Sequence, residues 1–353
     1  MKITIAAVGD IMLGRGVSSI PNKQFLDLVD PELLKLLAAD VVTGNLECIL
    51  GMKGAPSALS HSHFRADPER AGSLLRLFHV VSLANNHIND FGPEAIQDTI
   101  YILDHLGVKW VGIGRTKDEA TQPVVIEASG RRIAIFGATT VSTLRVGDPY
   151  CASTPDGHLW RKITGYKDAG YVCLLHLHTG GGDLPHPAPF VRHLMRDAIR
   201  AGCDVVLGHH PHVVQGYEKF NNGKAIAFYS LGDFLFDKLE GGRDKSLLVR
   251  IQKCDDNAGF DIAVHPVKRF PDFRICPMAP GDHALTLSHI EELSVIISSG
   301  ASDNAYRSAL GSPLKILASS ILKDVRTGGL TALVAKIGRL DRRRLSLLFP
   351  WLK

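Results

Sequence analysis

Residues 204–212 read DVVLGHHPH, a short apolar run that ends in a glycine and three histidines. Branched apolar residues followed by a turn signal are typical of a buried strand. Histidines are concentrated around this segment, because seven of the 16 in the chain fall between positions 176 and 212. Since imidazole is the commonest metal ligand in proteins, the segment indicates a metal site at the end of a strand.

Similar apolar runs alternate with helical patterns along the chain, which favours an α/β sheet protein. The helical patterns begin at prolines in three cases, and proline suits the first turn of a helix. The predicted strands are Ile3–Val8, Ala39–Thr43, Val80–Leu83, Arg132–Phe136, Tyr171–Leu175, Asp204–Leu207, Ala225–Ser230 and Ser246–Ile251. The predicted helices are Asn22–Leu37, Pro68–Phe78, Pro93–Leu106 and Pro189–Ala201.

Polar residues of metal-ligand type follow four further strands, and ligands of open α/β sheets bind at the carboxyl ends of strands. Carboxylates, amides and imidazoles together suit two divalent metals such as Mn, Zn or Fe. Such a pair clamps a phosphate and lowers the pKa of a water molecule, and a nearby histidine can protonate the leaving oxygen. The four strand ends are Gly9-Asp10, Gly44-Asn45-Leu46-Glu47, Ala84-Asn85-Asn86-His87 and His176-Leu177-His178.

Each of these residues also has a simpler explanation. Asp10 suits a helix N-cap, and Asn86-His87 suits a tight turn. His176 and His178 point to the same side of a strand, so one of them can be structural, and we favour His178 as the ligand because it lies at the strand end. The histidines around Pro211 are hardest to explain by core packing.

Composition excludes several classes of protein. The 353 residues carry a net charge of +4 and only 7% aromatic residues, so we expect no nucleic-acid partner. We find no signal peptide and no apolar stretch long enough to span a membrane. Six scattered cysteines contain no CxxC pair. These features predict a reduced, cytoplasmic setting.

Two regions are expected to differ from the sheet. Residues 137–170 are long and polar, which suggests an ordered loop or a lid over a cleft. Residues 301–353 hold ten Lys/Arg against three Asp/Glu and show helical periodicity. This tail can pack on the core, contact a synthase, or lie on an anionic membrane surface. We therefore predict two domains, residues 1–282 and a basic, mainly helical extension over residues 283–353.

The strand-end motifs together resemble the capsule-synthesis CapA or poly-γ-glutamate biosynthesis family, a branch of the calcineurin-like metallophosphoesterases. The resemblance spans about residues 1–240 and implies a four-layer αββα sandwich of two sheets flanked by helices. Its matching pieces, in order, are GDIMLGR (9–15), GNLE (44–47), SLANNHINDFG (82–92), GIGR (112–115), the His-x-Gly stretch at 178–180, GHHPHVVQG (208–216) and YSLGDFLFD (229–237).

The resemblance also implies a metal pocket, with His87 beside the bound phosphate or water. We expect His87 to act in catalysis together with Asp10, Glu47 and His178. The implied metal ligands are Asp10, Asn45, Glu47, Asn86, His178, His210 and His212.

This chain departs from the superfamily and family patterns at four places. Met12 stands where the superfamily has a histidine, and Asn45 with Glu47 replaces its Gly-Asp. Residues 178–182 lack the usual Trp and Glu, which opens the pocket wall and leaves Asp183 as a substitute. Asp233 replaces an asparagine and can bind metal or pair with Arg15 or Arg115.

An anionic substrate, a phosphate ester or a peptide-like molecule, would need cations near the metals. For each arginine an exposed salt bridge is the alternative role. The predicted substrate-binding residues are Arg15, Arg65, Arg115, His176, His209 and Asp233.

The leading function hypothesis is therefore a metal-dependent hydrolase. One alternative is an epimerase or isomerase that uses the same pocket for proton transfer on a peptide-like substrate. A second alternative is a non-catalytic scaffold for envelope-polymer assembly.

Overall fold

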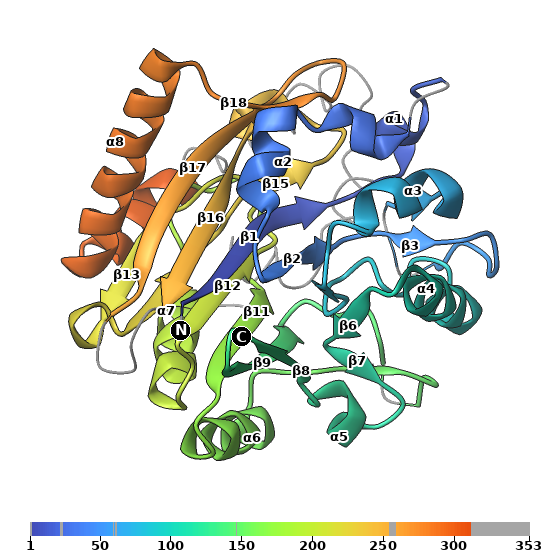
Figure 1. Ribbon diagram of the computed structural model, residues 1–353, viewed down its shortest axis with the longest axis horizontal. Coiled ribbons are helices and arrows are strands. Elements are labelled where there is room, and N and C mark those ends of the chain that lie inside the picture. The colour runs from blue at the N-terminus through green and yellow to red at the C-terminus, as the bar shows by residue number, and fades with distance from the viewer. Residues whose placement is uncertain are drawn as a thin grey trace, which may run out of the picture. The chain divides into compact units, whose positions relative to one another are not determined.

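The computed structural model describes residues 2–21, 24–58, 60, 62–145, 147–253 and 259–311 of the chain. Contacts divide the chain into two compact units, Met1–Ser302 and Asp303–Lys353. Both large sheets and helices α1–α8 lie in the first unit (Figure 1). In the second unit, residues 303–311 are helical. Residues 312–353, which hold most of the predicted C-terminal extension, lie outside the described residues.

An eight-stranded sheet has the order β18-β17-β16-β1-β2-β5-β6, with β15 paired to β1. Strands β2, β5 and β15 run parallel to their neighbours, whereas β16, β17 and β18 are antiparallel. The bounds are β1 (Ile3–Ile11), β2 (Val41–Leu46), β5 (Val80–Ser82), β6 (Lys109–Val111), β15 (Asp233–Leu235), β16 (Lys245–Lys253), β17 (Asp261–Arg269) and β18 (Ile275–Pro277).

A six-stranded sheet has the order β13-β14-β12-β11-β9-β8, and two pairs of two-residue strands lie beside the large sheets. The bounds are β8 (Val124–Ala128), β9 (Arg131–Thr139), β11 (Val172–His178), β12 (Val205–His209), β13 (Tyr217–Phe220) and β14 (Ala225–Phe228). The short pairs are β3 (Ile49–Leu50) with β4 (Arg65–Ala66), and β7 (Ile113–Gly114) with β10 (Cys151–Ala152).

Alternation along the strands places apolar side chains on both faces of the first sheet. Ile3, Ile5 and Ala7 of β1 join a core cluster with residues of the six-stranded sheet, so this cluster lies between the sheets. Ala6 and Val8 join a second cluster with residues of α2, α3 and α4. Because both faces of β1 are buried, it reads as a continuous apolar run, as expected of a central strand.

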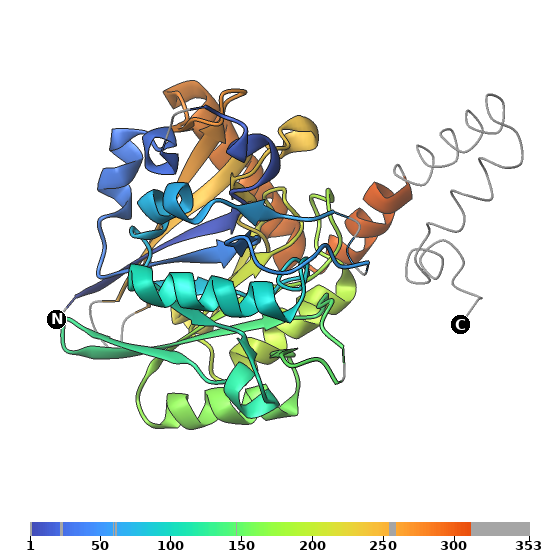
Figure 2. The ribbon, with the colours of Figure 1, turned by 90° about the vertical axis from the view of Figure 1, so that its right-hand side faces the viewer.

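Helices cover the outer faces of both sheets, and Figure 2 shows this from the side. Helices α6 and α7 contact β11, β12 and β14, and α8 packs on β13 and β17. The result is the α/β sandwich that the sequence predicted. The helix bounds are α1 (Arg15–Ser18), α2 (Pro31–Leu37), α3 (Pro68–Leu75), α4 (Pro93–Leu106), α5 (Lys117–Ala120), α6 (Gly157–Asp168), α7 (Pro189–Arg200) and α8 (Pro280–Ser298).

Two predictions from the sequence were wrong in detail. Residues 137–170 are not one long loop, because they include β10 and α6. Asp156 caps α6 by accepting hydrogen bonds from the backbone of His158 and Leu159. The predicted helix 22–37 is a 3₁₀ turn at Phe25–Leu28 followed by α2, since Pro31 keeps Asp30 extended. The first two residues of that prediction lie outside the described residues.

The predicted domain boundary at residue 282 falls in the first turn of α8, which is part of the first unit. None of the helices in the described part of the chain combines the length and apolar composition that a bilayer crossing requires.

Candidate metal centre

Asp10 lies at the point where strands of the first sheet converge. Near the C-terminal end of β1, Asp10 is level in register with Asn45 of β2 and with Asp233 of β15. The register of β1 shifts between Ala7 and Asp10, an irregularity that re-aims a side chain. A Cβ at Gly9 would lie 1.8 Å from the carbonyl oxygen of Gly232, so only glycine allows this approach of β1 to the segment before β15.

The second sheet supplies the imidazoles. His178 is the last residue of β11 and His209 the last residue of β12, and the two are level in register. His210 and His212 follow on a loop with φ values of 93° and 62°, in the left-handed region that is strained for such residues. This backbone turns both rings toward the first sheet, where His210 N donates to Asp10 Oδ2 over 3.1 Å.

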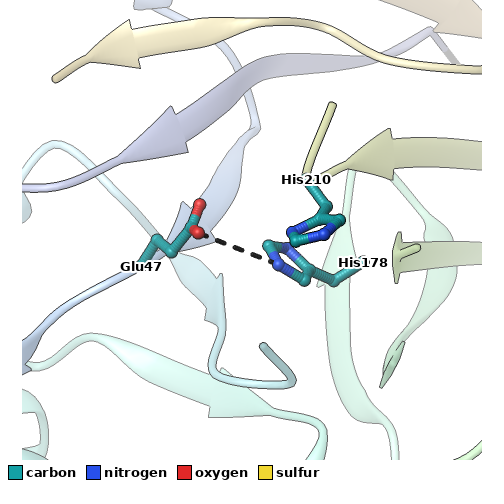
Figure 3. Close-up of side chains that lie close together, drawn as sticks. All are labelled: Glu47, His178 and His210. Carbon is teal, nitrogen blue, oxygen red and sulfur yellow. Dashed lines mark ion pairs between the residues drawn. The ribbon is translucent and has the colours of Figure 1, made fainter. Parts of the chain in front are cut away.

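Two groups of three side chains have ligand atoms within 4.8 Å of one another. Glu47, His178 and His210 form the first, and Figure 3 shows both rings on one side of the Glu47 carboxylate. Asp10, His212 and Asp233 form the second. Glu47 Oε1 of the first group lies 3.8 Å from His178 Nε2 and also 3.9 Å from His212 Nε2 of the second group. The two groups would therefore suit a pair of neighbouring cations.

Several buried polar atoms support cation binding. Both oxygens of Glu47, Asp233 Oδ2 and His210 Nδ1 are buried and find no hydrogen-bond partner among the described residues. Unpartnered buried polar atoms are rare in folded proteins, and a bound ion is one explanation. Neutral imidazole, carboxylate and amide donors together match Zn, Mn or Fe. The residues present therefore fit a metal pair.

The surroundings of Glu47 and Asp10 shift the pKa values of these two carboxylates in opposite directions. Burial, followed by the charges of Asp10 and Asp233, raises the pKa of Glu47 well above its ordinary range. Burial also opposes ionisation of Asp10, but the hydrogen bond and charge of His209, followed by the other histidines, lower the pKa of Asp10. Glu47 therefore needs a cation to ionise, whereas Asp10 is already held as an anion.

The imidazoles of the first group are suited to metal coordination. Burial and the charge of His212 lower the pKa of His210 to about 3. Burial and the charge of His210 lower the pKa of His178. Both rings are therefore neutral at pH 7, which is the form that binds a cation. His212 differs, because the charge and hydrogen bond of Asp233 outweigh burial and raise the pKa of His212.

The two amides among the predicted ligands lie at this site. Asn45 Nδ2 donates to Asp10 Oδ1 over 2.8 Å, and Asn86 Oδ1 lies 2.8 Å from His178 Nε2. Asn85 Nδ2 donates to Asn45 Oδ1 and to the carbonyl of Leu46, and it holds the end of β2 in place.

His87 stands at the mouth of the site in a fixed orientation. Its Nδ1 lies 2.8 Å from Asp90 Oδ2 and its Nε2 lies 3.8 Å from Glu47 Oε1. The ring stacks on Phe64 with centroids 3.8 Å apart. Sequence reasoning missed Asp90 and Phe64. Asp90 had a signal, since it follows His87 by three residues in the same motif, whereas Phe64 comes from a loop without one.

The predicted substrate-binding residues divide into three kinds. Arg15 lines the cavity of about 240 Å³ over His87 and His212, and it pairs with Asp237 rather than with Asp233. His176 and His209 are buried behind the ligands, whereas Asp233 is itself a member of the second ligand group, and none of the three lines that cavity. Arg65 and Arg115 do not line it either.

Each of these two arginines has other contacts. The guanidinium of Arg65 donates to the carbonyls of Met52 and Lys53 and lies over the Phe91 ring. The backbone N–H of Arg115 donates to Glu119.

Asp233 and Asp183 have partners that the sequence did not indicate. Asp233 Oδ1 lies 2.8 Å from His212 Nδ1, and the buried Arg269 donates to the Asp233 carbonyl. Asp183, suggested as a substitute in the pocket wall, pairs with Arg243 and not with a metal ligand. Arg243 and Lys238 line the cavity together with Arg15. No sequence motif marked these late cations.

Known protein families and proteins include several that are similar to this chain. A family model described as "Bacterial capsule synthesis protein PGA_cap" matches residues 4–238. Capsule biosynthesis protein CapA of Bacillus anthracis is 32% identical in an alignment of 250 residues that covers 67% of this chain and 60% of that protein. This chain thus spans less than two thirds of that relative.

Two further relatives are similar over most of the same region. PGA biosynthesis protein CapA of Bacillus subtilis strain 168 is 29% identical in an alignment of 273 residues that covers 74% of this chain and 70% of the relative. A probable polyglutamine synthesis accessory protein of Mycobacterium tuberculosis is 26% identical in an alignment of 285 residues that covers 67% of this chain and 74% of the relative.

Proposed function

Because this chain belongs to the bacterial capsule synthesis family, we propose that it is a metal-dependent hydrolase of phosphate esters or related acyl bonds in capsule or poly-γ-glutamate biosynthesis. The observation that carries the hydrolase proposal is the pair of neighbouring three-residue ligand groups, of which Glu47 belongs to the first. The names of the Bacillus relatives support the biosynthetic setting.

The ligand set suits two divalent cations, held by Glu47, His178 and His210 on one side and by Asp10, His212 and Asp233 on the other. Bound there, such cations supply Lewis acidity toward a phosphoryl or carbonyl oxygen and lower the pKa of a water molecule. Asn45 and Asn86 contact the ligands from the first sheet and its following loop. Asn86 also lines the cavity, where its amide can reach a substrate.

His87 is the residue best placed to move a proton at the mouth of the site. A carboxylate oxygen only accepts, so His87 Nδ1 donates to Asp90 and the other nitrogen, Nε2, faces Glu47. Stacking on Phe64 fixes the plane of the ring. We assign the cationic form of His87 the delivery of its Nε2 proton to the leaving oxygen, which leaves a neutral ring that still donates from Nδ1 to Asp90, the orienting carboxylate.

The cavity wall favours an anionic substrate. Arg15, Lys238 and Arg243 line the cavity, together with the hydroxyls of Ser60 and Ser62. Arg15 and Arg243 are held by Asp237 and Asp183 respectively, whereas the Lys238 side chain is exposed. Charge-assisted hydrogen bonds from such groups bind phosphate or carboxylate oxygens. The proposed substrate therefore carries its negative charge beside the metal centre.

Hydrolysis of generic phosphomonoesters and diesters by the full chain tests this proposal. Turnover should require Mn or Zn and should fall about 100-fold in His87→Asn, the lower end of the range for a general acid. His105→Asn, on the exposed face of α4, is the matched control and should retain full turnover. A metal-loaded protein that hydrolyses no ester would contradict the hydrolase proposal.

A further inference from the structure

A chain of three buried hydrogen bonds runs from Asp10 into the contact between the two sheets. His209 Nδ1 lies 2.9 Å from Asp10 Oδ1, and His209 Nε2 lies 3.0 Å from His176 Nδ1. His176 Nε2 then lies 2.7 Å from Thr43 Oγ1. All four side chains are 1% exposed or less. Bulk water therefore does not reach any of these three hydrogen bonds.

The chain crosses between the sheets twice. Thr43 and Asp10 belong to β2 and β1 of the eight-stranded sheet, whereas His176 and His209 belong to β11 and β12 of the six-stranded sheet. The surrounding contact between the sheets is an apolar cluster. Polar groups buried among apolar side chains are costly unless every donor and acceptor is matched. The ring nitrogens of His176 and His209 are thus matched only by each other, by Asp10 and by Thr43.

The chemistry of the end groups makes the chain complete. The Asp10 carboxylate only accepts, so His209 Nδ1 carries a proton and donates to it. His209 Nε2 and His176 Nδ1 share the next hydrogen bond, and the Thr43 hydroxyl, which can donate or accept, satisfies His176 Nε2.

We propose that Thr43, His176 and His209 are positioning residues that form a buried donor chain and fix the orientation of the Asp10 carboxylate as a metal ligand. Asp10 Oδ1 also accepts from Asn45 Nδ2, so it is occupied by two donors. Oδ2 accepts from His210 N and keeps a lone pair for a cation. Partners behind a ligand commonly set metal affinity by orienting it. This inference rests on the proposed metal centre.

Nitrogen-15 NMR of the histidines in the full chain, free of metal, tests the chain directly. His209 Nδ1 should carry a proton, and a scalar coupling across the hydrogen bond should join His209 Nε2 to His176 Nδ1. An unprotonated His209 Nδ1, or two rings without that coupling, would overturn the proposal. This result does not depend on any activity, so it also decides the case where the proposed hydrolase function fails.

Two matched variants test the consequence for the metal site. Thr43→Val removes the hydroxyl and keeps the shape, and Thr43→Ser keeps the hydroxyl. Titration with zinc should show about 10-fold weaker binding in Thr43→Val and wild-type binding in Thr43→Ser, as for other residues that support metal ligands. Equal zinc affinity in all three folded proteins would overturn the positioning role. If Thr43→Val fails to fold, the coupling between His209 and His176 in the wild-type protein still decides the proposal.

Discussion

Two carboxylates that share one site, Asp10 and Glu47, have opposite surroundings. Asp10 accepts hydrogen bonds from Asn45, His209 and the backbone of His210, whereas neither oxygen of Glu47 has a hydrogen-bond partner among the described residues. The pKa of Asp10 is accordingly lowered and that of Glu47 raised. The difference indicates that the metal-free protein already stabilises the anion of Asp10, whereas the anion of Glu47 depends on a bound cation.

The largest effect is expected for Asp10→Asn. Its amide NH₂ would face the donors that now surround the carboxylate, so the metal-free protein should lose about 3–5 kcal/mol of unfolding free energy, as when a buried charged network loses one partner. Metal affinity should also fall. Urea unfolding in chelator measures the first effect, with the exposed Asp261→Asn as the control. A metal-free Asp10→Asn protein as stable as wild type would remove the contrast.

Glu47→Gln should act in the opposite direction on the metal-free protein. An acid whose pKa is raised by folding destabilises the fold at pH values above its unfolded pKa, here about 4.5. In chelator at pH 7, the unfolding free energy of Glu47→Gln should equal that of wild type or exceed it by about 1–2 kcal/mol. Its metal affinity should fall about 100-fold. A large loss of metal-free stability would mean that Glu47 has a partner of its own.

The cations at the cavity mouth sharpen the comparison because they contact neither Asp10 nor Glu47 directly. Lys238→Ala should raise KM for a phosphate ester about 10-fold, the effect of one lost charge-assisted hydrogen bond, and leave metal content unchanged. Lys35→Ala, on the exposed face of α2, is the matched control. A drop in metal content instead would place Lys238 in the support of the ligands.

The smallest effect is expected away from the site, at the N-cap of α6. Asp156→Ala should lower the unfolding free energy by about 1 kcal/mol and leave metal binding unchanged. Burial opposes ionisation, but bonds from Lys117, Thr154 and the helix N-terminus lower the pKa of Asp156 to about 2. Its stabilisation is therefore present above the unfolded pKa and lost as pH falls from about 4 to 2. Stability that does not differ between wild type and variant at pH 7 would contradict this capping role.

The sequence predicted the fold from its apolar runs. It also predicted that most members of the two three-residue groups lie close together, because these residues follow the ends of predicted strands. Strands such as β1 and β12 are apolar runs closed by glycine and a polar residue, and that pattern is local. The outcome at residues 137–170 was less predictable, since α6 has few buried apolar residues and depends on the cap at Asp156.

Partners that come from late in the chain had no local pattern at all. Arg269 lies in β17, a strand that sequence reasoning missed, and it contacts the carbonyls of Asp233, Lys238 and Arg243. The donor chain through Thr43 and His176 also depends on which residues face each other between two sheets. Such pairing is set by tertiary packing, so a single sequence does not reveal it.

Elemental analysis of protein purified without chelator tests the central claim most directly. Two ligand groups of three residues predict about two divalent cations per wild-type chain and a lower content in Glu47→Gln. Wild-type protein with no bound metal after incubation with Zn or Mn, and with no difference from Glu47→Gln, would contradict the account.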